Sequence, residues 1–101
     1  MSNQSFQELI KNNVPTLVDF HAEWCGPCKM MKPELEKLKS QVGEKLKIIK
    51  IDIDKNPQVA SSFRVQSVPT LILFKDGQVK WRQSGALTSS QIKQVIQQFI
   101  S

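Results

Sequence analysis

The chain has 101 residues, of which 40% are hydrophobic and 23% charged, as is ordinary for one compact globular domain over residues 1–101. Its net charge of +5 comes from lysines and arginines scattered along the chain, so we expect no nucleic-acid partner. No apolar run reaches the ~18–20 residues of a membrane span, and the start MSNQSFQELI lacks the basic and apolar regions of a secretory signal. We therefore expect a cytoplasmic protein without a membrane segment.

Two elements are predicted before the first cysteine. Ser5 and Glu8 have the spacing of a capping box, which predicts a helix over residues 5–12. The apolar run at residues 16–20 predicts a strand, and Pro15 is tolerated at its start.

A longer helix is expected to begin near Cys25 and to stop at Gly43, with a kink at Pro33. The residues that recur at helical spacing are Met31, Leu35, Leu38 and Val42. The isoleucine-rich residues 47–53 predict a second strand, and Asn56 with Pro57 has the pattern of a short helix start.

The pattern of the last part of the chain predicts a hairpin followed by a helix. Residues 70–74 and 78–82 flank Asp76-Gly77, a strong signal for a tight turn between antiparallel strands. Thr88 and Gln91 can cap a final helix, whose apolar stripe is formed by Ile92, Val95, Ile96 and Phe99. This order of elements predicts an α/β fold with a mixed central sheet and helices on both faces.

Both cysteines of the chain, Cys25 and Cys28, follow the first predicted strand, at the sheet edge where reactive groups gather in such folds. A purely structural disulfide would not persist in a reducing compartment. Structural zinc needs four ligands, and the chain offers no third cysteine and only the poorly placed His21. A redox-active dithiol is therefore favoured. At a helix N-terminus, the pKa of the Cys25 thiol should fall below the free value of ~8.5.

The motif WCGPCK, preceded by VDF and followed by a proline, resembles the active-site region of the thioredoxin family. The similarity extends over nearly the whole chain, through IIKIDIDKNP, the VPT at residues 68–70, LILFKDG and Gly85. It implies the thioredoxin fold and a general protein-disulfide reductase without a bound cofactor or metal. In such a protein Cys25 attacks the disulfide of a partner, and Cys28 then breaks the mixed disulfide.

The resemblance also implies roles for other residues. Asp19 would accept and donate the proton of Cys28, and its place in the run LVDF independently predicts burial and a raised pKa. A solvated aspartate at a strand end is the alternative. Lys50 would lie near this acid, although an edge-strand lysine that discourages aggregation explains it equally well. The expected substrate-binding residues are Trp24, Gly26, Pro27, Val68, Pro69 in the cis form, and Gly85.

Two departures from the family stand out. Met1 precedes the Ser5 cap by four residues, which leaves little room for the usual first strand, so we expect four strands and an exposed edge at residues 47–53. His21 stands where many relatives carry a bulky aromatic residue, and it could tune Cys25 or be inert.

We expect a monomer, because the lysines of the edge strand oppose pairing, and the resemblance implies that it receives electrons from an NADPH-dependent thioredoxin reductase. Its expected partners are ribonucleotide reductase, peroxiredoxin and methionine sulfoxide reductase. A binding module that uses only the surface around Trp24, and an oxidase or isomerase of the same fold, are the alternatives. The intact dithiol argues against the first alternative, and Gly26-Pro27 against the second.

Overall fold

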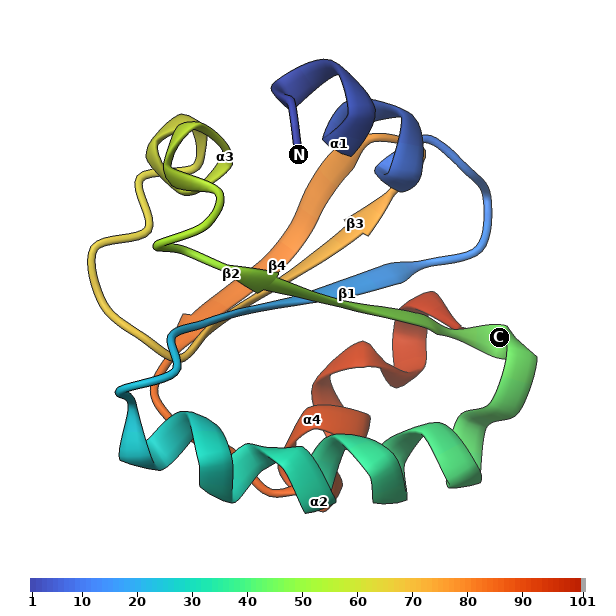
Figure 1. Cartoon of the computed structure of the whole chain (residues 1–101). Coiled ribbons are helices and arrows are strands. Elements are labelled where there is room, and N and C mark those ends of the chain that lie inside the picture. Colours follow the sequence, from blue (N-terminus) through green and yellow to red (C-terminus); the bar gives the residue numbers. More distant parts are fainter. Residues whose placement is uncertain (101) are drawn as a thin grey trace.

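The computed structural model describes residues 1–100 and places a four-stranded sheet between two layers of helices (Figure 1). The strands are β1 (Thr16–His21), β2 (Lys47–Asp52), β3 (Thr70–Lys75) and β4 (Gln78–Ser84). Their order in the sheet is β2-β1-β3-β4, with β1 and β2 parallel and the other neighbouring pairs antiparallel. This arrangement confirms the predicted mixed α/β sheet of four strands.

The helices cover both faces of the sheet. Helices α1 and α3 lie on one face, and α2 and α4 lie on the other (Figure 1). Their bounds are α1 (Asn3–Ile10), α2 (Gly26–Val42), α3 (Pro57–Ser62) and α4 (Ser89–Ile96), with short 3-10 turns η1 (Gly43–Lys45) and η2 (Gln97–Phe99). Within residues 1–100, no helix combines the length and the apolar character that crossing a membrane requires.

The alternation of side chains along β1 divides the core into two halves. Leu17 faces α2 and α4, where it packs with Leu38 and Ile92. Val18 points the other way, toward α1 and α3, into a cluster that includes Phe6 and Phe20. Because both faces of β1 are covered, this strand is almost entirely buried, and any polar group on it is shielded from water.

The first helix begins earlier than predicted. Ser2, not Ser5, is its N-cap, because the Ser2 Oγ accepts a hydrogen bond from the Ser5 N–H at 3.0 Å. The predicted capping box of Ser5 and Glu8 was therefore wrong. Starting at Asn3 buries Phe6 and Ile10 against the sheet.

The turns near the ends of α2 and between β3 and β4 follow their sequence signals. Gly43 caps α2 with a φ of 58°, a backbone conformation that glycine adopts without strain. Asp76 and Gly77 have φ values of 55° and 80°, as a tight hairpin turn with two left-handed residues requires. The predicted hairpin is confirmed, and β4 extends to Ser84 because Ser84 pairs with Thr70.

Strand β2 forms one edge of the sheet in the described part of the chain. It pairs with β1 alone, and Lys47 and Lys50 are exposed on it. The expectation of an exposed edge at this strand is thus confirmed. Lysines on an edge strand discourage pairing with another chain.

Candidate active site

The two cysteines lie where β1 leads into α2. Cys25 is the N-cap residue of α2, and its Sγ accepts a hydrogen bond from the Cys28 N–H at 3.1 Å. The two side chains form a disulfide, with 5.3 Å between their Cα atoms. Cys25 is 3% exposed and Cys28 is 8% exposed, so only a small part of each residue meets solvent. The N–H groups of the first helical turn are placed to stabilise a Cys25 thiolate once the disulfide is reduced.

Asp19 lies in the buried middle of β1. The residue is 3% exposed, and its Oδ1 has no hydrogen-bond partner within residues 1–100. Burial raises the pKa of the Asp19 carboxyl above its ordinary value of 3.8, and the nearby positive charges of His21 and Lys50 offset part of this rise. The structure therefore agrees with the buried aspartate and not with the solvated alternative.

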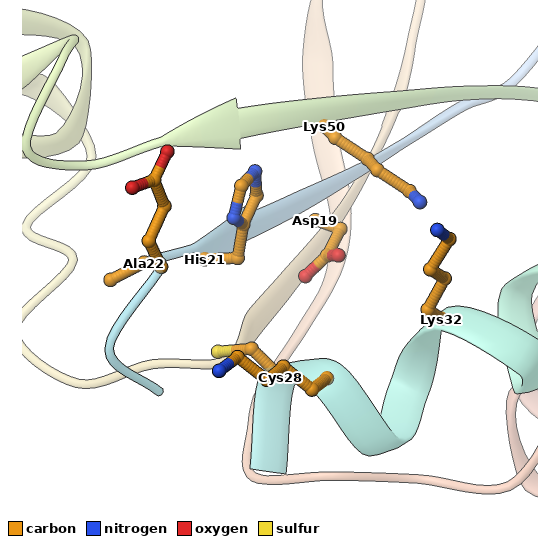
Figure 2. A pocket seen from close by; sticks show the side chains of 8 residues that line it. Asp19, His21, Ala22, Cys28, Lys32 and Lys50 are labelled. Carbon is orange, nitrogen blue, oxygen red and sulfur yellow. The ribbon is translucent and has the colours of Figure 1, made fainter. Parts of the chain in front are cut away.

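A cavity of about 220 Å³ is lined by both Asp19 and Cys28. Figure 2 shows Asp19 between His21 on one side and the two lysines Lys32 and Lys50 on the other, with Cys28 at the start of α2. Lys50 is the β2 residue directly opposite Asp19. The residues that line the cavity are Asp19, His21, Ala22, Glu23, Cys28, Lys29, Lys32 and Lys50.

The other flank of the dithiol is formed by the segment before β3. The Val68–Pro69 peptide bond is cis, and Val68 packs against the buried cluster that contains Cys25 and Cys28. The Pro69 carbonyl accepts a hydrogen bond from the Gly85 N–H at 2.8 Å. Gly85 has a φ of 96°, and a Cβ there would meet open space. The positive φ favours glycine at this position, while the open space leaves room for an approaching chain.

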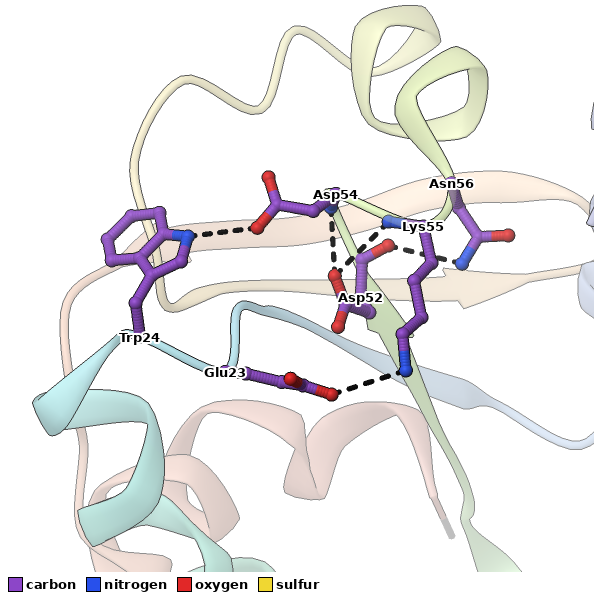
Figure 3. A network of polar contacts seen from close by, with 6 residues as sticks. All are labelled: Glu23, Trp24, Asp52, Asp54, Lys55 and Asn56. Atoms are coloured by element: carbon purple, nitrogen blue, oxygen red, sulfur yellow. Dashed lines mark hydrogen bonds and ion pairs between the residues drawn. The ribbon is translucent and has the colours of Figure 1, made fainter.

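A polar network ties the loop before Cys25 to the end of β2 (Figure 3). The indole Nε1 of Trp24 donates to Asp54 Oδ2 at 2.9 Å, although the residue remains 68% exposed. The Lys55 Nζ lies 3.2 Å from Glu23 Oε1. The Asp52 carboxylate orders the loop by accepting from the Asp54 N–H at 2.8 Å.

The structure thus brings most of the predicted site residues to one end of the sheet. Gly26 and Pro27 are exposed in the first turn of α2, and Lys50 lines the cavity from its exposed edge. Sequence reasoning missed Asp54 as the partner of Trp24. An aspartate followed by residues that favour a turn, as in Asp52–Asn56, is a local signal for such a loop, but it does not indicate the tryptophan. Among residues 1–100 there is no group of three or more side chains that could hold a metal ion.

A cysteine pair at a helix start, beside a buried acid on a mixed sheet, defines a thiol-disulfide oxidoreductase. The family model described as thioredoxin matches residues 1–98. The chain belongs to the thioredoxin family, and it is a protein-disulfide oxidoreductase with a redox-active cysteine pair.

Individual relatives agree with this assignment. A thioredoxin of Rhodospirillum rubrum is 46% identical over 93 residues, which cover 91% of this chain and 89% of that protein. A mutant thioredoxin from Halobacterium salinarum matches with a TM-score of 0.89 and 34% identity, covering 100% of this chain and 88% of the other. A chain from a yeast structure on thiol resolution in a mitochondrial 1-Cys peroxiredoxin matches with a TM-score of 0.87 and 36% identity. The match covers 96% of this chain and 90% of that chain.

Proposed function

We propose that this chain is a general electron donor that reduces disulfides in several partner proteins. The Cys25 thiolate attacks one sulfur of the partner's disulfide, and the other sulfur leaves as a thiolate. Cys28 then loses its proton and attacks the Cys25 sulfur, which releases the partner's second sulfur. Two electrons pass to the partner, and the Cys25–Cys28 disulfide remains.

In this mechanism Asp19 takes the proton of Cys28. The observation that carries the proposal is the shared cavity, which is lined by Cys28 and by Asp19, whose Oδ1 lacks a hydrogen-bond partner in the described residues 1–100. A buried carboxyl with a raised pKa is a better proton acceptor near neutrality than an ordinary aspartate. Lys50 lies opposite Asp19, where its charge favours the carboxylate after proton release.

The partner binds on the opposite flank. Trp24 offers a large exposed ring, and Val68 offers backbone groups before the cis proline Pro69. Gly85 leaves space for an extended segment of the partner beside them. Gly26 and Pro27, exposed beside the dithiol, complete this surface.

The partners are assigned by family and by chemistry. An NADPH-dependent thioredoxin reductase would restore the dithiol, and ribonucleotide reductase, peroxiredoxin and methionine sulfoxide reductase would consume its electrons. The yeast structure concerns peroxiredoxin thiol resolution through the glutathione and thioredoxin systems, which supports a peroxiredoxin as one partner. We place the protein in the cytoplasm, since a dithiol donor needs a reducing compartment, and we regard residues 1–101 as one domain.

The redox potential of the Cys25–Cys28 pair tests the proposal. The protein is equilibrated with a series of dithiothreitol mixtures, and the free thiols are alkylated and counted by mass. A potential near that of thioredoxin, about −270 mV, is expected for an electron donor. A potential above about −180 mV, toward the range of isomerases and oxidases, would contradict the reductase assignment.

A further inference from the structure

His21 lines the cavity beside Asp19, and the mechanism above does not use its imidazole. It lies two residues after Asp19 on β1, so both side chains point to the same face of the sheet, roughly 6.5 Å apart along the strand. The imidazole is half-buried, whereas Asp19 is almost fully enclosed. His21 therefore lies beside the buried carboxyl, at a more exposed position of the same cavity (Figure 2).

The other charged groups near His21 are poorly suited to take a proton at neutral pH. Lys29 and Lys32 on α2 and Lys50 on β2 carry ammonium groups, which donate hydrogen bonds and have no acceptor site for a proton. Glu23, in the loop before α2, is exposed and paired with Lys55. Asp52, opposite His21 on β2, already accepts backbone hydrogen bonds from the following loop. An imidazole, by contrast, takes up and releases protons between about pH 5 and 8.

We propose that His21 receives, through water in the cavity, the proton that Asp19 takes from Cys28, and passes it to solvent. The proposal rests on the role of Asp19 given above. The proton leaves Cys28 as its sulfur attacks Cys25, resides on Asp19, and moves to the neutral imidazole, so that the carboxylate is restored beside an imidazolium. The cavity of about 220 Å³ has room for several waters of about 30 Å³ each, and the Asp19 carboxyl and the His21 imidazole both line it and can hydrogen-bond to such waters.

The electrostatics of the cavity favour this transfer. After the transfer, the Asp19 carboxylate lies beside a protonated His21, and this opposite charge stabilises the carboxylate and so lowers the pKa of the Asp19 carboxyl. Without the imidazole, the proton must stay on Asp19 or leave through water alone. The pair is consequently a better acceptor for the Cys28 proton than Asp19 by itself.

The test resolves the two thiol steps in time. Reduced protein is mixed in a stopped-flow instrument with an aromatic disulfide whose thiolate is coloured, from about pH 5 to about pH 9. The first coloured thiolate reports the attack by Cys25, and the second reports the release of the mixed disulfide by Cys28. The second aromatic thiolate is a stable anion and leaves without being protonated. The rate of the second phase therefore depends on the removal of the proton from Cys28.

We expect His21→Gln to slow the second phase about 5- to 20-fold at neutral pH and to move its pH midpoint upward. This loss is smaller than the ~10²–10⁴-fold of a direct acid–base group, because water still reaches the cavity. The first phase should be unchanged. Added imidazole should restore the second phase in His21→Ala, where the side chain leaves space, but not in Asp19→Asn.

Lys32→Gln is the matched control, because it removes a positive charge from the same cavity without removing a proton acceptor. We expect its second phase to stay within about twofold of the wild type. The proposal is overturned if His21→Gln leaves the second phase unchanged, if Lys32→Gln moves it equally, or if imidazole gives no rescue. An effect of Asp19→Asn with none of His21→Gln would retain the proposed role of Asp19 and reject the relay. If Asp19→Asn has no effect on the second phase, the proposed role of Asp19 and the relay through His21 both fail.

Discussion

The Asp19 carboxyl is buried and its Oδ1 has no hydrogen-bond partner in residues 1–100, so its ionised form destabilises the folded chain. Its pKa is raised in the folded state, so the folded protein holds this proton at pH values where the unfolded chain has lost it. The contribution of Asp19 to the free energy of unfolding should then be most favourable below about pH 3.8. It should fall as the pH rises through the raised pKa of the folded state. A site built for proton transfer thus reduces stability near neutrality.

Asp19→Asn removes this charge and keeps the shape of the side chain. We expect the variant to have a free energy of unfolding at neutral pH higher by on the order of 1 kcal/mol, because a neutral amide costs less to bury than a carboxylate. The difference should shrink as the pH falls toward the ordinary aspartate range. Urea unfolding of the oxidised proteins at a series of pH values measures it, and equal stabilities at every pH would contradict the assignment.

The residues of the site were predictable to different degrees. Cys25, Cys28 and Asp19 could be found because motif and hydrophobic pattern are local in the sequence. The bond between Trp24 and Asp54 could not, because it joins segments 30 residues apart that meet only when β2 pairs with β1. The position of His21 in the cavity depends on the same pairing and on the approach of α2.

At the scale of elements, helix starts depend on single side chains. Thr88 caps α4, accepting from the Gln91 N–H at 3.1 Å while the Gln91 side chain accepts from the Thr88 N–H at 2.9 Å. This box was predictable because one threonine fits the pattern. The first helix was predicted wrongly because Ser2 and Ser5 can both serve as caps, and the choice follows from the tertiary burial of Phe6 and Ile10.

Thr88→Ala should lower the free energy of unfolding by about 1 kcal/mol, the usual cost of losing an N-cap side chain. Helix α4 packs in the same hydrophobic cluster as α2, so a weaker α4 lowers the stability of the whole fold. Ser90→Ala, at an exposed position of the same helix, is the control and should change stability by less than about 0.5 kcal/mol. Equal effects of the two substitutions would show that the capping box contributes nothing.

At the scale of the molecule, the exposed edge of β2 governs association. Its Lys47 and Lys50 would bring like charges close together if two copies paired through this strand around Lys50. We therefore expect sedimentation at micromolar concentration to give the mass of one chain. A dimer mass would contradict this and would point to pairing through β2.

The enclosure of Cys25 has a consequence for what the protein can attack. The residue is 3% exposed and Val68 packs against the cluster that contains it, so a partner sulfur has only a small part of Cys25 to approach. A disulfide on a protruding, flexible loop can make that approach, whereas one packed inside a rigid fold cannot. We expect the chain to select disulfides by their accessibility and not by the surrounding sequence, and to leave buried structural disulfides of folded proteins intact.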